Sequence, residues 1–588
     1  MSTFEIKSDS FYLDGKPFRV LSGAMHYFRI LPVYWEDRLL KLKAAGLNTV
    51  ETYVPWNFHE TREGEFNFTG THDVERYIEL AGKLGLKVIV RPSPYICAEW
   101  EFGGLPAWLL KNESIELRCA DETYMEKIKA YYKVLIPRLV KHQCTKGGPV
   151  LMMQIENEYG SYGNDSDYLR FLAQQMRENG IDVPLFTSDG EMPFHLTGGT
   201  LPDVFKVINF STGDPSETFN HLKAFQPDKP IMCGEFWMGW FDHWGENHHA
   251  GGDAVKNFRS GAEGLLKMGA SFNLYMFHGG TTFGYMNGAN TAGTFYQPDI
   301  SSYDYDCGLD EQGNPTEKYF AFRELVEKYI GKLEPLKLPE PSKTKAFGKV
   351  ALTQCADLFS QLENLSGGAK KTAAVRPMEY FGQNYGFILY RTKVRPVGQA
   401  QIKICDIHDR AHVFLDGKRE GIIYRNDEDE DVDYNFEKDE TTLDIFVENM
   451  GRVNFGCLLK DFKGITDYVA IGGQKQFGWE TYNIELDDIG KVAFSPCDKE
   501  QAEGPVFLRG KFDADEPADT FLRCDSLTKG QAWVNGFNLG RYWTAAGPQR
   551  TLYIPAALLK QGENELVIFE TDAASEMQVE LTDKSDLG

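Results

Sequence analysis

The stretch Val150-Leu-Met-Met-Gln-Ile-Glu-Asn-Glu-Tyr-Gly160 decides the fold assignment. Its first half is an apolar run of strand length, and the run leads directly into Glu158. A second stretch, Cys233-Gly-Glu-Phe-Trp237, places Glu235 in the same way after strand-like residues. A carboxylate at the end of a buried strand is costly unless it is hydrogen-bonded or neutralised. Two such carboxylates are therefore candidates for one functional site.

The first part of the chain, to about residue 330, alternates short β-branched runs with longer amphipathic stretches. This pattern is typical of a parallel sheet with crossover helices. Eight strands in such a segment predict a closed (β/α)8 barrel, whereas an open doubly wound sheet would carry a Gly-rich phosphate-binding turn, which is missing. The expected strands are Phe18–His26, Asn48–Pro55, Lys87–Pro92, Val150–Ile155, Leu185–Ser188, Lys206–Phe210, Pro230–Glu235 and Ser271–Phe277. The expected helices include Trp35–Ala45, Thr71–Leu84, Glu122–Gln143 and Ser166–Asn179.

The strand count places the two carboxylates at one end of the barrel. Glu158 follows the fourth expected strand and Glu235 ends the seventh. Barrel enzymes carry their chemistry at the carboxyl ends of the strands. Other expected strand ends also carry polar and aromatic residues, such as His26, Tyr53 and Arg91. Packing alone does not explain polar residues at the same end of so many strands.

The composition changes near Leu333–Lys345, which is rich in proline and predicts a linker. Short alternating strands follow, and the segment 410–418 resembles the segment 530–537. Two all-β sandwich domains, jelly rolls, are the simplest interpretation, with Asp-Gly and Asn-Gly as hairpin turns. We expect a catalytic barrel over 1–335, a linker and first all-β domain over 336–480, and a second over 481–588. We leave open whether strands from 345–390 also belong to that second domain.

Bulk properties exclude several classes of partner. The formal net charge of -24 argues against nucleic acid and anionic membranes, which select basic surfaces. No stretch approaches the roughly 20 apolar residues that span a bilayer. The N-terminal residues lack the features of a secretion signal, and the ten cysteines are scattered, which favours reduced thiols in a cytoplasmic protein. A homodimer is one hypothesis for its assembly.

The carboxylates suit the cleavage of glycosidic bonds. That reaction needs a proton donor at the leaving oxygen and a second carboxylate at the anomeric carbon. Asn157 precedes Glu158 and is placed to bind the sugar hydroxyl beside the reacting carbon. Glu156 shares its strand parity with Glu158 and could also point inward, but we favour a supporting role for it. His243, His248 and His249 match no compact metal-binding motif, so we expect neither a metal nor a cofactor.

Five longer motifs are spread over the expected barrel. They are Tyr53-Val-Pro-Trp-Asn-Phe-His-Glu60, Arg91-Pro-Ser-Pro-Tyr-Ile-Cys-Ala-Glu-Trp-Glu101, Gln154-Ile-Glu-Asn-Glu-Tyr-Gly160, Gly234-Glu-Phe-Trp-Met-Gly-Trp240 and Ser302-Tyr-Asp-Tyr-Asp306. Together they resemble family 35 of the glycoside hydrolases, the barrel β-galactosidases, and in particular their cytoplasmic bacterial β-1,3-galactosidases. The all-β tail also resembles the accessory, galactose-binding-like domains of that family.

The resemblance implies a retaining exo-β-galactosidase that removes terminal β-linked galactose from oligosaccharides. It assigns Glu158 as acid/base and Glu235 as nucleophile. It also implies a galactose pocket lined by Tyr53, Cys97, Ala98, Glu99, Asn157, Tyr285, Tyr303 and Tyr305. Trp237 and Trp240 follow the nucleophile and could stack on the leaving-group sugar or pack the rim.

Two alternatives remain open. An exo-β-glucosaminidase would use the same fold with an acidic group facing the amine of the sugar. A non-catalytic sugar-binding protein usually lacks one of the two carboxylates, and this chain has both. For the leaving-group linkage, the aromatic residues after Glu235 lead us to favour β-1,3 over β-1,4.

Overall fold

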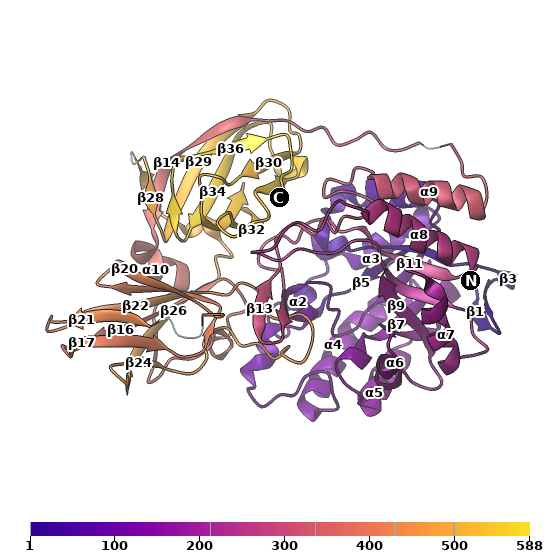
Figure 1. Cartoon of the computed structure of the whole chain (residues 1–588), viewed down its shortest axis with the longest axis horizontal. Helices are drawn as coiled ribbons and strands as arrows, with labels where there is room; N and C mark the ends of the chain where they lie inside the picture. Colours follow the sequence, from indigo (N-terminus) through magenta and orange to yellow (C-terminus); the bar gives the residue numbers. More distant parts are fainter. Residues whose placement is uncertain (1, 212, 336, 428–430, 498–499) are drawn as a thin grey trace.

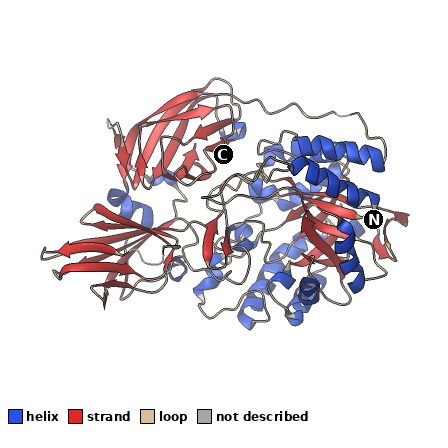
Figure 2. Ribbon diagram, viewed as in Figure 1, coloured by secondary structure: helices blue, strands red, loops and turns tan. Residues whose placement is uncertain are grey.

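The computed structural model describes residues 2–211, 213–335, 337–427, 431–497 and 500–588. It has a helix-covered barrel on one side and two all-strand units on the other (Figures 1 and 2). Residue 336, within the expected linker, lies outside the described residues. None of the described helices is long and apolar enough to cross a membrane.

Eight parallel strands close into a barrel in the order β10-β11-β4-β5-β6-β7-β8-β9. This closure confirms the predicted (β/α)8 architecture, in which β7 is the fourth barrel strand and β10 the seventh. The strands are β4 (Leu21–Met25), β5 (Thr49–Tyr53), β6 (Lys87–Arg91), β7 (Val150–Asn157), β8 (Leu185–Gly190), β9 (Phe205–Ser211), β10 (Met232–Trp237) and β11 (Ser271–His278).

Helices surround the barrel (Figure 1). Several begin where an aspartate caps the exposed backbone N–H groups of the first turn. Asp73 accepts from the Arg76 N–H, and Asp121 accepts from the Tyr124 N–H, each at 2.9 Å. The helices are α1 (Trp35–Ala44), α2 (Trp56–His59), α3 (Val74–Lys83), α4 (Glu122–Val140), α5 (Ser166–Glu178), α6 (Pro193–Gly199), α7 (Pro215–Phe225), α8 (Ala254–Lys267) and α9 (Glu317–Tyr329).

A small N-terminal sheet, β1 to β3, packs against the barrel, where Phe11 meets Phe205 edge to face with ring centroids 5.4 Å apart. A hairpin of β12 and β13 leaves the barrel before α9 and lies beside the first all-β unit (Figure 1). These strands are β1 (Phe4–Lys7), β2 (Ser10–Leu13), β3 (Lys16–Pro17), β12 (Ala289–Ala292) and β13 (Phe295–Pro298).

The first all-β unit packs a six-stranded sheet, β15-β26-β16-β22-β19-β20, on a four-stranded one, β21-β17-β24-β25. Apolar side chains such as Val413, Ile445 and Ile471 fill the space between the two sheets. The strands are β15 (Lys370–Thr372), β16 (Phe387–Val394), β17 (Gly398–Ile404), β19 (Arg410–Leu415), β20 (Lys418–Tyr424), β21 (Val432–Phe436), β22 (Thr441–Glu448), β24 (Val469–Ile471), β25 (Gln474–Lys475) and β26 (Trp479–Ile484). Two further strands, β18 (Ile407–His408) and β23 (Gly464–Ile465), pair with each other.

The second all-β unit includes β14 (Gly348–Asp357), which follows the linker directly in sequence. Figure 1 shows the chain crossing from α9 to this strand before α10 (Leu358–Ser366) leads into the first unit. β14 lies between β29 and β36. The other strands are β27 (Ser495–Pro496), β28 (Ala502–Glu503), β29 (Val506–Ala514), β30 (Thr520–Arg523), β31 (Lys529–Val534), β32 (Phe537–Trp543), β33 (Thr551–Ile554), β34 (Gly562–Glu570), β35 (Ala573–Ala574) and β36 (Gln578–Thr582).

The two predicted hairpin turns are confirmed. Asp416-Gly417 joins β19 to β20, and its residues have φ of 49° and 80°. Asn535-Gly536 joins β31 to β32, with φ of 49° and 83°. Positive φ at both central residues is the requirement of the tight turn that matches strand twist. The expected domain bounds at 335 and 480 stay predictions.

Candidate active site

The carboxyl ends of the barrel strands surround a cavity of about 250 Å³. Both predicted carboxylates, Glu158 after β7 and Glu235 in β10, line it. The other lining residues are Tyr53, Ile96, Cys97, Ala98, Glu99, Asn157, Trp237, Trp240, Phe241, Tyr275, Asn290, Tyr305 and Phe455. This cavity is the candidate active site.

Glu235 is held by three hydrogen-bond donors. Its Oε1 accepts from the Tyr53 hydroxyl and from Nη1 of Arg91, each at 2.6 Å. Its Oε2 accepts from the Trp237 indole N–H at 3.0 Å. A carboxylate that accepts several donors, one of them a cation, is stabilised in its charged form. Glu235 is therefore arranged as a fixed anion.

Glu158 lies in a different environment. Among the described residues, only the Asn209 amide donates to its carboxylate, at 3.1 Å. Burial, and next the charge of Glu235, raise the pKa of Glu158 to about 8. The two carboxyl groups thus have opposite tendencies, since one is held as an anion and the other keeps a proton near neutral pH.

The backbone at Glu158 explains how adjacent residues face the same cavity. Along β7, Glu156 points away from the barrel interior, where Arg118 binds both of its oxygens at 2.9 and 3.0 Å. Asn157 points inward on the same side as Gln154, because the pairing of β7 with β8 shifts its register between these two residues and interrupts the strand alternation. Glu158 then adopts a left-handed backbone with φ of 48°, and its side chain faces the same cavity as that of Asn157. The parity argument for an inward Glu156 is therefore wrong, and its supporting role fits the buried pair with Arg118.

Asn157 is fixed from several sides. Its Oδ1 accepts from Nη2 of Arg91 at 2.7 Å, and the Tyr53 hydroxyl lies 2.9 Å away. Its Nδ2 donates one proton to the Ile96 carbonyl at 3.1 Å. Since an amide nitrogen carries two protons, the other is left for a ligand in the cavity.

Cys97, Ala98 and Glu99 enter the cavity from a strained loop, residues 97–104. All three adopt left-handed backbones, with φ of 58°, 58° and 48°. Such conformations cost on the order of 1–3 kcal/mol each and cluster at functional sites. Backbone contacts hold the loop, because Gly288 donates to the Glu99 carbonyl at 3.1 Å and Arg29 donates to the Ala98 carbonyl at 2.6 Å.

Glu99 and the tyrosines form the far wall of the cavity. The Tyr303 hydroxyl donates to Glu99 Oε2, and Tyr275 lies 3.2 Å from the Tyr303 hydroxyl. Burial raises the pKa of Glu99 to about 7. Tyr303 thus positions Glu99 through a hydrogen bond and does not line the cavity itself, whereas Tyr305 and Tyr275 do.

Tyr285 is not part of this wall. Its ring stacks on Tyr385 of the first all-β unit, with centroids 5.2 Å apart, and it lines a separate cavity. The expectation that Tyr285 lines the galactose pocket is corrected accordingly, because its ring packs against Tyr385 and Phe387 of the first all-β unit. Tyr275 of β11 takes its place in the cavity.

The rim of the cavity is aromatic. Trp237 and Trp240 meet edge to face at 5.8 Å, and Trp240 stacks on Phe241 at 4.9 Å. Trp240 remains 40% exposed, so a flat face is open to solvent. Phe455 completes the rim from loop 449–456 of the first all-β unit, which extends into the barrel mouth.

Sequence reasoning missed several residues that support the site. Arg91 belongs to a quoted motif but received no role, although it contacts both Glu235 and Asn157. Glu51 on β5 lies 3.5 Å from the same guanidinium, and burial raises its pKa to about 7. Tyr275 could have been found from its inward parity with Asn273 on β11, whereas Asn290 lies on the short strand β12, which has no local pattern that indicates the site. For Phe455, the sequence left two positions open for loop 449–456, over the barrel mouth or at a domain interface, and favoured the interface; the structure places Phe455 in the lining of the cavity.

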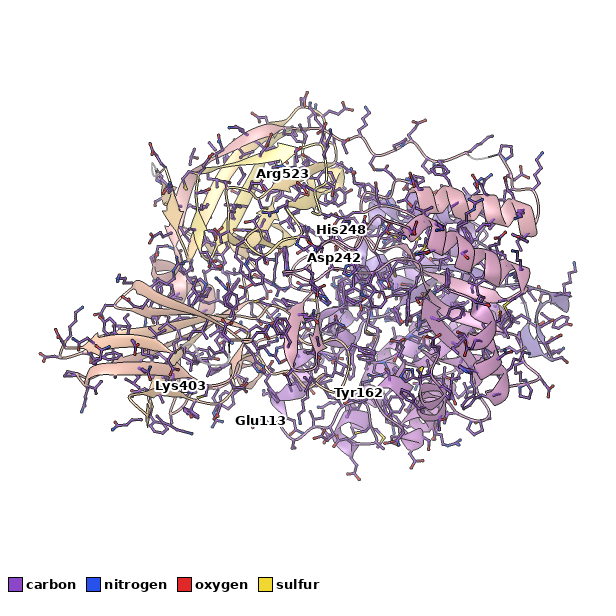
Figure 3. All side chains as sticks on the ribbon, in the orientation of Figure 1. Glu113, Tyr162, Asp242, His248, Lys403 and Arg523 are labelled. Atoms are coloured by element: carbon purple, nitrogen blue, oxygen red, sulfur yellow. The ribbon has the colours of Figure 1, made fainter. Side chains whose placement is uncertain are left out.

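No His, Cys, Asp or Glu cluster among the described residues could hold a metal ion. His248 and His249 instead donate to Asp242, with distances of 2.6 and 2.5 Å, and Asp242 and His248 lie together at the junction of the domains (Figure 3). The hydrogen bond to Asp242 raises the pKa of His248. These histidines fasten the segment that follows Trp240 and Phe241.

Comparison with known proteins decides the family. The model described as glycosyl hydrolases family 35 matches residues 10–329, which is more than half of the chain. The chain belongs to family 35 of the glycosyl hydrolases. Models of the first all-beta domain and the galactose-binding domain of beta-galactosidase match residues 376–485 and 505–564. The barrel and the two all-β units described above thus each match a separate model.

Curated family 35 relatives match nearly the whole chain. The beta-galactosidase of Bos taurus is 41% identical, over 97% of this chain and 91% of the relative. The beta-galactosidases of Mus musculus and Homo sapiens are 42% and 41% identical, over 96% and 98% of this chain and 91% and 88% of the relatives. As a member of family 35, the protein is a glycoside hydrolase.

Proposed function

We propose that the protein is a retaining exo-β-galactosidase that releases terminal β-linked galactose from oligosaccharides. The observation that carries the proposal is the contrast between Glu235, which accepts three donors, and Glu158, whose pKa is raised to about 8 in the same cavity. Membership of family 35 and the similarity to curated beta-galactosidases support the choice of sugar.

In the proposed mechanism, ionised Glu235 attacks the anomeric carbon while protonated Glu158 donates its proton to the leaving oxygen. Attack forms a bond from a Glu235 carboxylate oxygen to the sugar and breaks the glycosidic bond. The glycosyl-enzyme removes the Glu235 charge, which lowers the proton affinity of Glu158 so that it can act as base toward water. Water then releases galactose with its configuration retained.

The remaining wall residues would hold the galactose ring. The free proton of the Asn157 amide is placed for the hydroxyl beside the reacting carbon, a contact that strengthens in the transition state. Glu99, which is held by the Tyr303 hydroxyl, would accept hydrogen bonds from the hydroxyls on the far side of the galactose ring. Tyr53, Tyr305 and the 97–98 backbone would complete the pocket.

The pH dependence of the reaction follows from Glu158. Its pKa is raised to about 8, so the acid form is present at neutral pH and is lost as the pH rises. We expect kcat/KM for an unactivated galactoside to fall about tenfold per pH unit above roughly pH 8. A dinitrophenyl galactoside, whose leaving group needs no proton, serves as the control, and its kcat/KM should not fall in this pH range. If kcat/KM falls equally for both substrates, the assignment of Glu158 as the acid is contradicted.

We favour β-1,3-linked substrates, because the aromatic rim of Trp237, Trp240 and Phe455 offers flat surfaces to the leaving-group sugar. One panel of four substrates tests sugar and linkage together. Nitrophenyl β-galactoside should be cleaved at least about 100-fold faster than nitrophenyl β-glucosaminide, and lacto-N-biose faster than N-acetyllactosamine. Preference for the glucosaminide would favour the alternative sugar, and faster cleavage of N-acetyllactosamine would overturn the linkage.

A cytoplasmic location and a homodimer stay predictions from the sequence. The buried cysteines Cys97, Cys144, Cys233, Cys307 and Cys524 are free thiols, which is compatible with a reducing compartment.

A further inference from the structure

A second cavity, of about 320 Å³, lies where the barrel and both all-β units meet. Tyr285 and Trp100 line it from the barrel, Tyr385 and Asp487 from the first unit, and Phe537 and Asn538 from the second. None of these residues lines the candidate active site. The chain therefore builds this cavity from segments that are far apart in sequence, separately from the catalytic carboxylates.

Aromatic rings make up much of its wall and are held in fixed positions. Tyr285 stacks on Tyr385 at 5.2 Å, with an angle of 17° between the rings. Phe283 meets Phe537 edge to face at 5.1 Å. Trp100 is 1% exposed and packs against Phe28 at 4.6 Å. Binding to rings that are already ordered costs little conformational entropy.

The polar groups of this cavity include one that is buried without a partner. Tyr285 is 4% exposed, and its hydroxyl makes no hydrogen bond of normal geometry to a described residue, although the Asn538 side chain lies near it. A buried hydroxyl without a partner costs free energy, which a bound ligand can recover by accepting or donating a hydrogen bond. The Asp487 carboxylate, which accepts from the Tyr385 hydroxyl at 2.6 Å, lies on the same wall.

The charge of the wall restricts the ligand. Among the described lining residues there is no lysine, arginine or histidine, and the charged group is the Asp487 carboxylate, which is paired with Arg62 at 3.1 Å. A phosphorylated or sulfated ligand would therefore meet a carboxylate on the wall, and the nearby guanidinium is already paired with it. A purely apolar ligand would leave the Tyr285 hydroxyl without a partner.

We propose that this cavity is a second, non-catalytic binding site for a neutral saccharide. A pyranose ring has an apolar face that packs on aromatic rings, and hydroxyls that pair with tyrosine, amide and carboxylate groups. Its chemistry thus matches both parts of the wall. The assignment does not depend on hydrolysis at Glu158 and Glu235.

The second site shares a wall with the candidate active site. Glu99 lines the catalytic cavity, and the next residue, Trp100, lines the saccharide cavity. The Glu101 N–H donates to the Met286 carbonyl at 2.8 Å, which joins loop 97–104 to the Tyr285 segment. A saccharide at the second site therefore contacts the same loop that holds Glu99.

Calorimetric titration of the full-length Glu235→Gln chain with lactose, cellobiose and maltose tests the site, because lactose is then not consumed. We expect at least one disaccharide to bind at a site that Phe537→Ala removes and that Tyr285→Phe weakens about 3- to 10-fold through the lost hydrogen bond. The matched control is Phe295→Ala, on β13, because Phe295 is 57% exposed and lies outside this cavity. Cooperative thermal unfolding of each variant establishes that it is folded.

The number of molecules bound separates this proposal from the catalytic one. If both hold, adding Phe537→Ala to Glu235→Gln removes one binding site for the disaccharide that occupies the second cavity, and lactose still binds at the catalytic cavity; if only the second site exists, adding Phe537→Ala abolishes all binding. Equal binding by Phe537→Ala and Phe295→Ala overturns the proposal. The proposal is also overturned if the chain binds the neutral apolar probe N-phenylnaphthylamine but none of the three disaccharides.

Discussion

Replacement of Glu235 by glutamine should reduce kcat by a factor on the order of 10⁴ or more. Glutamine keeps the size of the side chain but removes the negative charge and the nucleophilic oxygen. It also removes the nearer of the two carboxylates beside the Arg91 guanidinium, at 2.6 Å, and leaves Glu51 at 3.5 Å. Steady-state hydrolysis of nitrophenyl β-galactoside measures the loss.

The same substitution at Glu113 is the matched control. Glu113 is exposed and does not line the cavity, and Figure 3 shows it near the lower edge of the molecule. Glu113→Gln should leave kcat within about twofold of the wild-type value, since surface changes remote from a site rarely affect it. Activity of Glu235→Gln close to that of this control would show that Glu235 does not form the covalent bond.

Azide distinguishes the two catalytic carboxylates. In Glu235→Gly the small anion can enter the vacated space and attack the anomeric carbon directly, which gives an α-galactosyl azide. In Glu158→Gly it should intercept the glycosyl-enzyme and give the β-product. Nuclear magnetic resonance of the products identifies the anomer, and α-product from Glu158→Gly alone would mean that the two roles are reversed.

The barrel could be predicted from sequence because its strands are apolar runs of regular length, separated by amphipathic helices. Each expected strand overlaps its observed counterpart, for example Val150–Ile155 and β7. Once the strands are counted, the geometry of a parallel barrel brings their carboxyl ends together. This is why Glu158 and Glu235 could be placed in one cavity although 77 positions separate them.

Other features depend on backbone conformations and long-range contacts that have no local pattern. The register shift in β7 between Gln154 and Asn157, followed by the left-handed backbone at Glu158, decides that Asn157 and Glu158, rather than Glu156 and Glu158, share the cavity. The placement of β14 in the sheet of β29 and β36 depends on pairing with residues more than 140 positions away. Tyr285 was misplaced for the same reason, since its ring belongs to a contact with Tyr385.

Loop 449–456 connects the first all-β unit to the barrel, and the second large prediction concerns the stability that this connection provides. Arg452 is fully buried in this loop. It donates to Glu101 of the barrel at 2.5 Å, to the Asn384 carbonyl at 2.5 Å, and through Nε to Glu379 at 3.0 Å. One guanidinium thus neutralises two carboxylates from two parts of the fold.

Arg452→Met should lower the free energy of unfolding by about 3–5 kcal/mol, because it leaves Glu101 and Glu379 buried and charged without their partner. Guanidinium unfolding followed by tryptophan fluorescence measures the effect as a shift of the midpoint. Arg395→Met, at an exposed position of the same unit, is the matched control and should change stability by less than about 0.5 kcal/mol.

The cost arises from the unpaired carboxylates rather than from the lost arginine itself, so it should be partly reversible. Adding Glu101→Gln and Glu379→Gln to Arg452→Met replaces two buried charges by neutral amides, which should recover a large part of the stability. The same loop carries Phe455 to the cavity rim, so kcat/KM should fall with Arg452→Met and rise again in the triple variant. If Arg452→Met is no less stable than Arg395→Met, the buried network does not hold the two units together, and the rim must be positioned by the backbone contacts of Val453 and Asn454 with Ala289.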